Sequence, residues 1–176
     1  MIAAVPFFLV FRFLHIVAGV LWVGSAFLFV GFIGPSAVEV GPAAGPLLTA
    51  AVKKRKVAKV ITGLGIVNVL AGWALWLRDM SLYGGAGNWV SSRFGLVLTI
   101  GGALATITFF VGYLGVGVPV ERLVDVGNEV ASSGGPPSPE QQTQIERLSA
   151  SIERHGKTDL LLLLLAVTAM ATARYW

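Results

Sequence analysis

Two ionisable side chains inside the first apolar stretch are the strongest candidates for chemistry. Arg12 and His15 lie within residues 5–33, a stretch with no other ionisable side chain. This stretch is long enough to cross a membrane, because a hydrocarbon core requires about 20 consecutive apolar residues. Ionisable groups are costly in lipid and normally face a bundle interior and a partner. We therefore consider His15 as a ligand of haem iron or another metal.

The residues around His15 form a helical stripe that suits a haem. His15, Gly19, Trp22 and Ala26 fall on one face, and Arg12 lies one turn toward the outer end of that face. Such a face offers an imidazole for iron, a small residue beneath the ring, an aromatic side chain beside it and a guanidinium for a propionate. The same stripe also suits plain packing, with His15 hydrogen-bonded across helices and Arg12 reaching the headgroups.

A second ligand can be sought by depth in the membrane. Met170 lies six residues before Trp176 and returns to about the depth of His15. A His and Met pair ligates haem iron and also suits copper(I), whereas plain core filling is the ordinary use of a buried Met. The other histidine, His155, should differ from His15 in height by roughly 27 Å, so one metal cannot bind both. We expect His155 to be exposed or interfacial.

Composition indicates that lipid is the solvent for much of the chain. Hydrophobic residues make up 55% and charged residues 12% of the 176 residues, and the mean hydropathy is +0.78. A single water-soluble core cannot bury that much apolar surface. The absence of cysteine excludes disulfides, thiolate metal sites and cysteine-ligated clusters. The net charge of +4 does not predict nucleic-acid binding, because the basic residues border apolar spans.

The apolar runs predict an all-α integral membrane protein, a bundle of four transmembrane helices in a single domain over residues 1–176. The expected spans are residues 5–33, 57–77, 94–118 and 158–173. The first lacks a basic leader region and is too long for the apolar core of a signal peptide, so we expect it to be retained. Glycines are frequent in the spans, which favours close helix packing.

The distribution of basic residues predicts the orientation. The connection between the first two spans and the connection at 119–157 hold nine basic residues: Lys53, Lys54, Arg55, Lys56, Lys59, Arg122, Arg147, Arg154 and Lys157. The opposite side holds Arg78, Arg93 and Arg174. By the positive-inside rule both connections are cytoplasmic and both termini lie outside.

The cytoplasmic connection at 119–157 has helical periodicity of its own. Apolar residues recur at near-helical spacing on both sides of the Ser, Gly and Pro-rich break at 132–137. We therefore expect two amphipathic helices there. Their charged faces suit a solvated surface, and a docking surface for a partner is the alternative.

Missing motifs narrow the function classes. Apart from Asp159 at the entrance of the fourth span, no carboxylate lies in a predicted span, which disfavours an ion pump or proton-coupled transporter. The chain contains no HExxH or GxSxG motif, and it contains no phosphate-binding glycine motif. Hydrolase and nucleotide-binding functions have no support.

The segment from Phe13 to Gly24, FLHIVAGVLWVG, resembles the "LH(I/V)xAxxxWxG" opening helix of copper-resistance protein D domains and of membrane-bound, haem-containing protoporphyrinogen oxidases. The segment from Thr158 to Met170 resembles a bacterial integral membrane family of unknown function grouped with them. The resemblance implies a four-helix bundle in which His15 ligates haem or copper. The chain lacks the second histidine at that depth and the RxxVxH continuation that complete the site in the oxidases.

These observations together predict a small multi-pass protein of the bacterial inner membrane with a haem-associated redox or cofactor-handling function. The expected cofactor is haem b, with copper as the alternative. The expected partners are the lipid bilayer and either a second copy or a membrane redox protein. A non-enzymatic accessory or assembly subunit, and a copper-handling protein, are the competing functions, and the sequence leaves open whether the protein is an enzyme.

Overall fold

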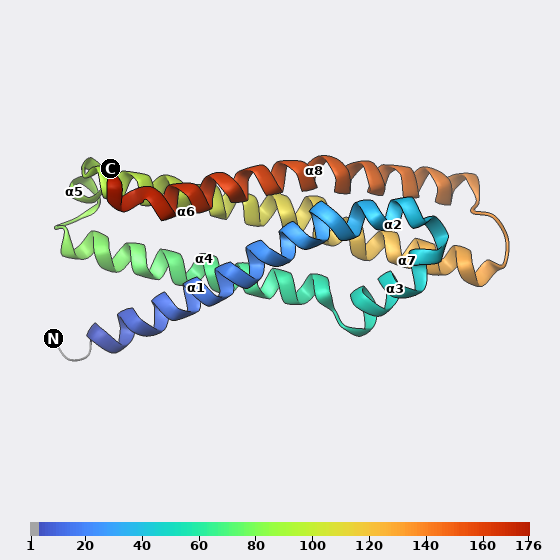
Figure 1. Cartoon of the computed structure of the whole chain (residues 1–176), viewed down its shortest axis with the longest axis horizontal. Helices are drawn as coiled ribbons and strands as arrows, with labels where there is room; N and C mark the ends of the chain where they lie inside the picture. Colours follow the sequence, from blue (N-terminus) through green and yellow to red (C-terminus); the bar gives the residue numbers. More distant parts are fainter. Residues whose placement is uncertain (1–3) are drawn as a thin grey trace. The chain divides into compact units, whose positions relative to one another are not determined.

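The computed structural model describes residues 4–176, which are mostly helical and have no strand among them. Four helical stretches are long and apolar enough to cross a membrane (Figure 1). They are Pro6–Lys54, Val57–Leu82, Arg93–Ser133 and Pro139–Tyr175. The all-α class and the four membrane-spanning helices are thereby confirmed, and the chain is a multi-pass membrane protein.

The first stretch extends well beyond the predicted end of the first span at residue 33. It consists of α1 (Ala4–Leu28), the π-helical turn η1 (Phe29–Ile33), α2 (Gly34–Val40), the 3-10 turn η2 (Gly41–Ala44), α3 (Gly45–Thr49) and the π-helical turn η3 (Ala50–Lys54). A proline stands in the first turn of α2, η2 and α3. Proline is tolerated there because the first N–H groups of a helix have no helical partner.

The second and third stretches begin close to the predicted positions. The second stretch is α4 (Val57–Leu82), and the third contains α6 (Arg93–Gly112), the π-helical turn η4 (Tyr113–Gly117) and α7 (Val118–Ser133). The short α5 (Ala86–Ser91) lies between the two stretches. α7 continues from α6 through η4, so the first amphipathic helix of the connection extends the third span. α7 ends at Gly134, whose φ of 69° is a left-handed conformation that glycine adopts without a steric penalty.

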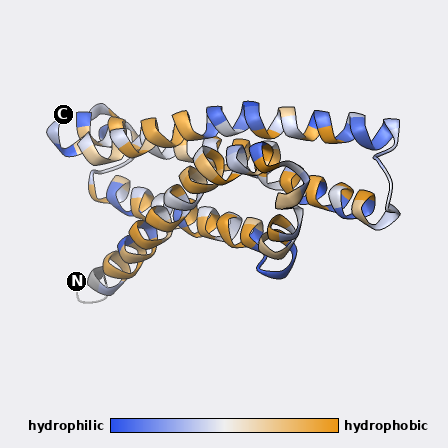
Figure 2. Ribbon diagram, turned by 45° about the vertical axis from the view of Figure 1, so that its right-hand side comes forward, coloured by the Kyte–Doolittle hydropathy of each residue, from blue (hydrophilic) through white to orange (hydrophobic). Residues whose placement is uncertain are grey.

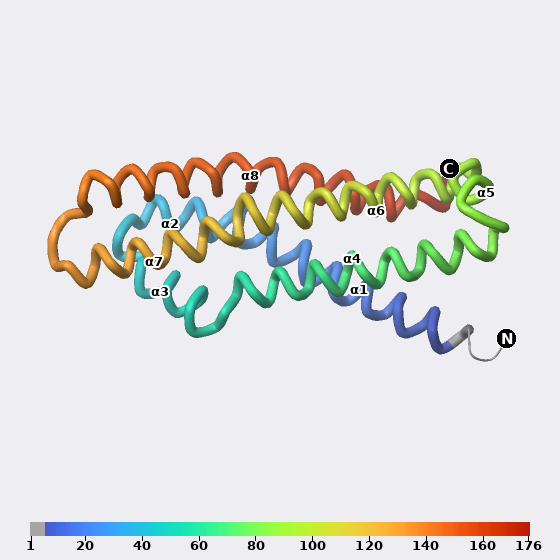
Figure 3. Tube along the Cα trace, turned by 180° about the vertical axis from the view of Figure 1, so that it is seen from behind, coloured from blue at the N-terminus to red at the C-terminus, as the bar shows by residue number. Residues whose placement is uncertain are grey.

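The last stretch is α8 (Pro139–Thr172), followed by the 3-10 turn η5 (Ala173–Tyr175). Both helices expected in the connection at 119–157 are present, and the second is continuous with the fourth span, because α8 runs through both without interruption. No proline lies between Pro139 and Trp176, and Gly156 is accommodated inside the helix. Figure 2 shows the polar first half of α8 and its apolar second half on one ribbon. The predicted break corresponds to the loop between α7 and α8 (Figure 3).

The chain forms two compact units. Unit 1 comprises Met1–Gly24, Gly63–Phe109 and Leu161–Trp176, and unit 2 comprises Ser25–Thr62 and Phe110–Leu160.

Unit 1 buries small and aromatic residues and exposes large aliphatic ones. Ala18, Trp22 and Ala105 are buried, whereas Val20 is 68% and Leu164 is 64% exposed. Small residues allow helix backbones to approach, and exposed aliphatic side chains are favourable only in lipid. This pattern fits the bilayer as the partner of the apolar faces.

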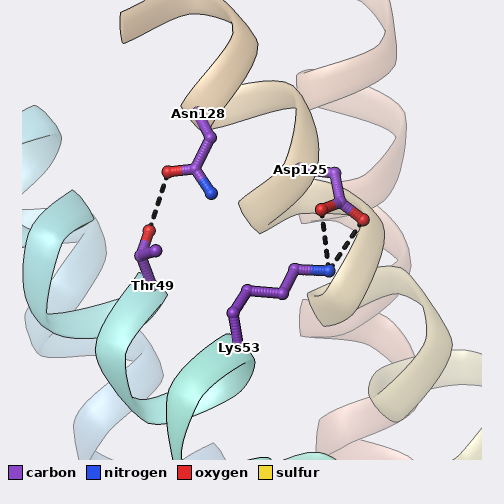
Figure 4. Close-up of polar contacts among 4 residues, drawn as sticks. All are labelled: Thr49, Lys53, Asp125 and Asn128. Atoms are coloured by element: carbon purple, nitrogen blue, oxygen red, sulfur yellow. Dashed lines mark hydrogen bonds and ion pairs between the residues drawn. The ribbon is translucent and has the colours of Figure 1, made fainter.

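In unit 2, polar side chains of α3 and η3 contact polar side chains of α7. Thr49 Oγ1 donates to Asn128 Oδ1 at 2.8 Å, and Lys53 Nζ lies 2.7 and 2.8 Å from the two carboxylate oxygens of Asp125 (Figure 4). These side chains are polar and largely solvent-facing, so the contact orders the connection after the first span at a small gain in stability.

Candidate ligand site at His15

His15 on α1 is held by the backbone of α4 within unit 1. Its Nδ1 atom lies 2.8 Å from the carbonyl oxygen of Asn68. A carbonyl can only accept, so Nδ1 carries the proton and donates it. In the neutral imidazole Nε2 is then the atom with a free lone pair. The structure thus bears out the interhelical hydrogen bond, and ligation of a metal by Nε2 stays a prediction.

Gly72 of α4 gives the imidazole of His15 room to reach the carbonyl of Asn68. Gly72 follows Asn68 by four residues, so its N–H is the helical partner of the same carbonyl. A Cβ atom at Gly72 would lie 2.8 Å from His15 Cε1 and 3.0 Å from Nδ1. Real Cβ atoms do not approach so closely, so glycine makes the room for the imidazole. Gly72 is one of many glycines in the sequence, and no local signal distinguishes it.

Gly19, one turn along α1, faces the side chain of Asn68. A Cβ atom at Gly19 would lie 2.7 Å from Asn68 Oδ1. Asn68 is only 6% exposed, so its amide is enclosed at this helix contact. The space beside Gly19 is therefore used by an amide, and a haem ring beneath Gly19 stays a prediction.

Trp22 belongs to the core of unit 1. It is 5% exposed and meets Phe109 edge to face, with 6.3 Å between ring centroids. Both rings cover Gly65 of α4, where a Cβ atom would lie 3.1 Å from Trp22 and 2.9 Å from Phe109. His15, Gly19 and Trp22 therefore share one antiparallel contact between α1 and α4, as the predicted stripe requires.

Two guanidinium groups lie near one ring at the start of α1. The Cζ atom of Arg12 is 5.4 Å and that of Arg78 is 4.7 Å from the centroid of Phe8. Arg78 also donates to Asp79 Oδ1 at 2.8 Å. The sequence identified Arg12 as the cation of the site. Arg78 entered only the count of basic residues, because nothing local places it opposite Phe8.

Met170 of α8 packs against α6, whereas His15 packs against α4. A Cβ atom at Gly101 of α6 would lie 3.0 Å from Met170 Cγ, whereas the contacts of His15 described above are made with α4. The pairing of Met170 with His15 stays a prediction. Among residues 4–176 there is no group of three or more His, Asp or Glu side chains that could hold a metal ion.

Two tryptophans of α4 contribute hydrogen bonds beside this contact. Trp73 Nε1 donates to Thr106 Oγ1 at 3.0 Å, and Trp76 Nε1 donates to Thr99 Oγ1 at 2.8 Å. Both bonds join α4 to α6, so the helix that carries Asn68 and Gly72 is fixed on a second side. Thr106 thus joins two helices, as polar residues within membrane spans commonly do.

Comparison of the chain with models of protein families, with curated proteins and with solved structures found no match.

Proposed function

We propose that this protein binds haem in the membrane through His15 and serves a redox or cofactor-handling function. The observation that carries the proposal is the 2.8 Å hydrogen bond from His15 Nδ1 to the carbonyl of Asn68. Metal-ligating histidines usually donate their second ring N–H to a carbonyl or carboxylate, which fixes the tautomer and orients the ring. The resemblance of the first span to haem-binding helices supports the same assignment.

The residues of α1 and α4 described above suit a haem at both its iron and its propionates. His15 Nε2 would hold the iron, and Arg12 and Arg78 would supply cations for its carboxylates near the start of α1. The haem iron, when bound, supplies a one-electron redox couple. The chain's own residues orient the imidazole through Asn68 and leave it room through Gly72.

The location proposed for this function is the bacterial inner membrane, with both termini outside. The nine basic residues of the two connections against three on the other side support that orientation. The start of α1, with Arg12, then lies near the outer surface. Copper bound by His15 and Met170 is the alternative cargo.

The test is the absorption spectrum of the full chain purified in mild detergent after expression with a haem precursor. We expect a Soret band and, after reduction, α and β bands. His15→Ala should lose these bands, whereas His155→Ala, the matched variant at the other histidine, should keep them. Arg12→Ala should weaken haem retention less than His15→Ala, because water can partly replace a propionate contact near the interface.

Size-exclusion chromatography of each variant controls for folding. A wild-type protein that stays colourless after incubation with haemin would overturn the proposal. Metal analysis for copper would then test the alternative cargo. If the protein binds neither haem nor copper, the role of His15 is the hydrogen bond between α1 and α4.

A further inference from the structure

A buried carboxylic acid lies in unit 2, in the part of α8 that leads into the apolar half. Asp159 is 4% exposed, and its Oδ1 atom has no hydrogen-bond partner among the described residues. An ionised carboxylate without a partner is expensive in a protein interior and more so in lipid. The sequence placed Asp159 at the entrance of the fourth span and gave it no role.

The surroundings of Asp159 favour a proton over a metal cation. A Cβ atom at Gly112 of α6 would lie 2.7 Å from Asp159 Oδ1, so this oxygen faces a glycine backbone. One turn earlier on α8, the side chain of His155 covers Gly115 in η4 just as closely. A hard cation requires about six or more oxygen ligands, and such close helix contact leaves no space for them.

The facing elements bring few groups that could compensate the charge. Gly156 of α8 packs against Val30 in η1, a turn without a titratable residue. The facing stretch from Gly112 through η4 has one titratable residue, Tyr113. On α8 itself, Arg154 and Lys157 are exposed, and Lys157 is paired with Glu153 at 2.6 Å. His155 is therefore the nearest base along the same helical face.

His155 is anchored to the preceding turn of α8 through one ring nitrogen. Its Nδ1 atom donates to the carbonyl of Ser151 at 2.9 Å and lies 3.2 Å from Ser151 Oγ, which donates to the carbonyl of Gly115 at 3.3 Å. With Nδ1 donating to a carbonyl, Nε2 is the ring nitrogen that can accept a hydrogen bond in the neutral imidazole. His155 is half-buried, and Asp159 follows it by one turn.

Gly115 and its neighbours form a π-helical turn, Tyr113–Gly117. Such turns interrupt the regular helical hydrogen bonds and are frequent at functional sites. Here the turn lies opposite His155 in a helix contact made of glycine on one side and titratable groups on the other. A purely structural contact between small residues would need neither the acid nor the base.

We propose that Asp159 is a proton-binding site within the membrane-spanning part of α8 and that His155 transfers its proton to and from water. In the uptake step His155 Nε2 gives its proton to an Asp159 carboxylate oxygen. The imidazolium becomes neutral imidazole, and the carboxylate becomes a carboxylic acid. Release is the reverse step, and His155 regains its proton from water. This inference does not rest on haem binding at His15.

Infrared spectroscopy of the full chain in lipid nanodiscs tests the site. At neutral pH the wild type should show the C=O band of a protonated carboxyl group. Asp159→Asn should lose the band, and Asp125→Asn, at an exposed carboxylate paired with Lys53, should keep it. If Asp159→Asn does not insert, Asp159→Glu should keep an acid with a shifted band. A wild type without the band, or a band that survives in Asp159→Asn, would overturn the proposal.

The role of His155 is tested by isotope exchange. After transfer into heavy water the carboxyl band shifts as deuterium replaces the proton. We expect His155→Gln to slow this shift by at least about tenfold, because general acid and base catalysis by a positioned histidine is lost. An unchanged rate would remove His155 from the proton route.

Discussion

At the scale of single residues, the candidate site consists of His15, which the sequence singles out, and of its partners on α4, which the sequence does not indicate. His15 and Arg12 stand out because they are ionisable groups in an apolar stretch. The acceptor for His15 is a backbone carbonyl at Asn68, and a main-chain group carries no residue signature. Gly72, which makes the room, is one of 22 glycines. The sequence singles out His15 as a candidate ligand, but it does not show the groups that orient the imidazole.

Replacement of Gly72 by Ala tests the contact that orients His15. The added Cβ would clash with the imidazole, so we expect Gly72→Ala to break the hydrogen bond to Asn68, lower haem occupancy and cost about 1–3 kcal/mol in stability. Gly63→Ala, on the same helix with no atom within 4 Å, should change stability by less than about 1 kcal/mol. Thermal unfolding in detergent measures both. Equal behaviour of the two variants would show that the contact at Gly72 is unimportant.

At the scale of elements, the presence of each helix was easier to predict than the residues at which it begins and ends. Apolar periodicity located four spans, and the break after Ser133 was visible from its glycines and prolines. The continuation of α8 through Lys157 and Thr158 was missed because a change from polar to apolar composition resembles a boundary although nothing in it stops a helix. The burial of Asp159 was not predicted either, because it depends on the close approach of Gly112 on α6.

Limited proteolysis tests this continuity. Protease added to the protein in detergent should cut first in the loop at 134–138, because these residues have no helical hydrogen bonds to protect them. The stretch at 153–158 should resist, since it lies inside α8 although several of its side chains are exposed. Mass spectrometry of the first fragments identifies the cut. Earliest cleavage at 153–158 would contradict a continuous α8.

At the scale of the whole molecule, hydropathy and charge determine where the protein resides and how it is inserted. Four apolar helices and exposed aliphatic residues identify a multi-pass membrane protein. Composition alone could predict this, because lipid is the only solvent that accepts such a surface. Orientation depends on the asymmetry of basic residues, which acts during insertion and leaves no mark in helix packing.

Reporter fusions test the orientation. A reporter that is active only in the cytoplasm should be silent when fused after Trp176 and active when fused within the loop at 134–138, because nine basic residues retain the two connections inside. A reporter active only outside should give the opposite pattern. Cytoplasmic activity after Trp176 would reverse the orientation and place Arg12 near the inner surface.

The most direct test of haem ligation by His15 is chemical rescue of a ligand deletion. His15→Gly removes the imidazole and leaves a space beside Gly72 that free imidazole can occupy. We predict that this variant, purified with haem supplied, lacks the Soret band of the wild type and regains it when imidazole is added, whereas His155→Gly has the band throughout. A Soret band that is unchanged in His15→Gly without imidazole would contradict the assignment of His15 as the ligand.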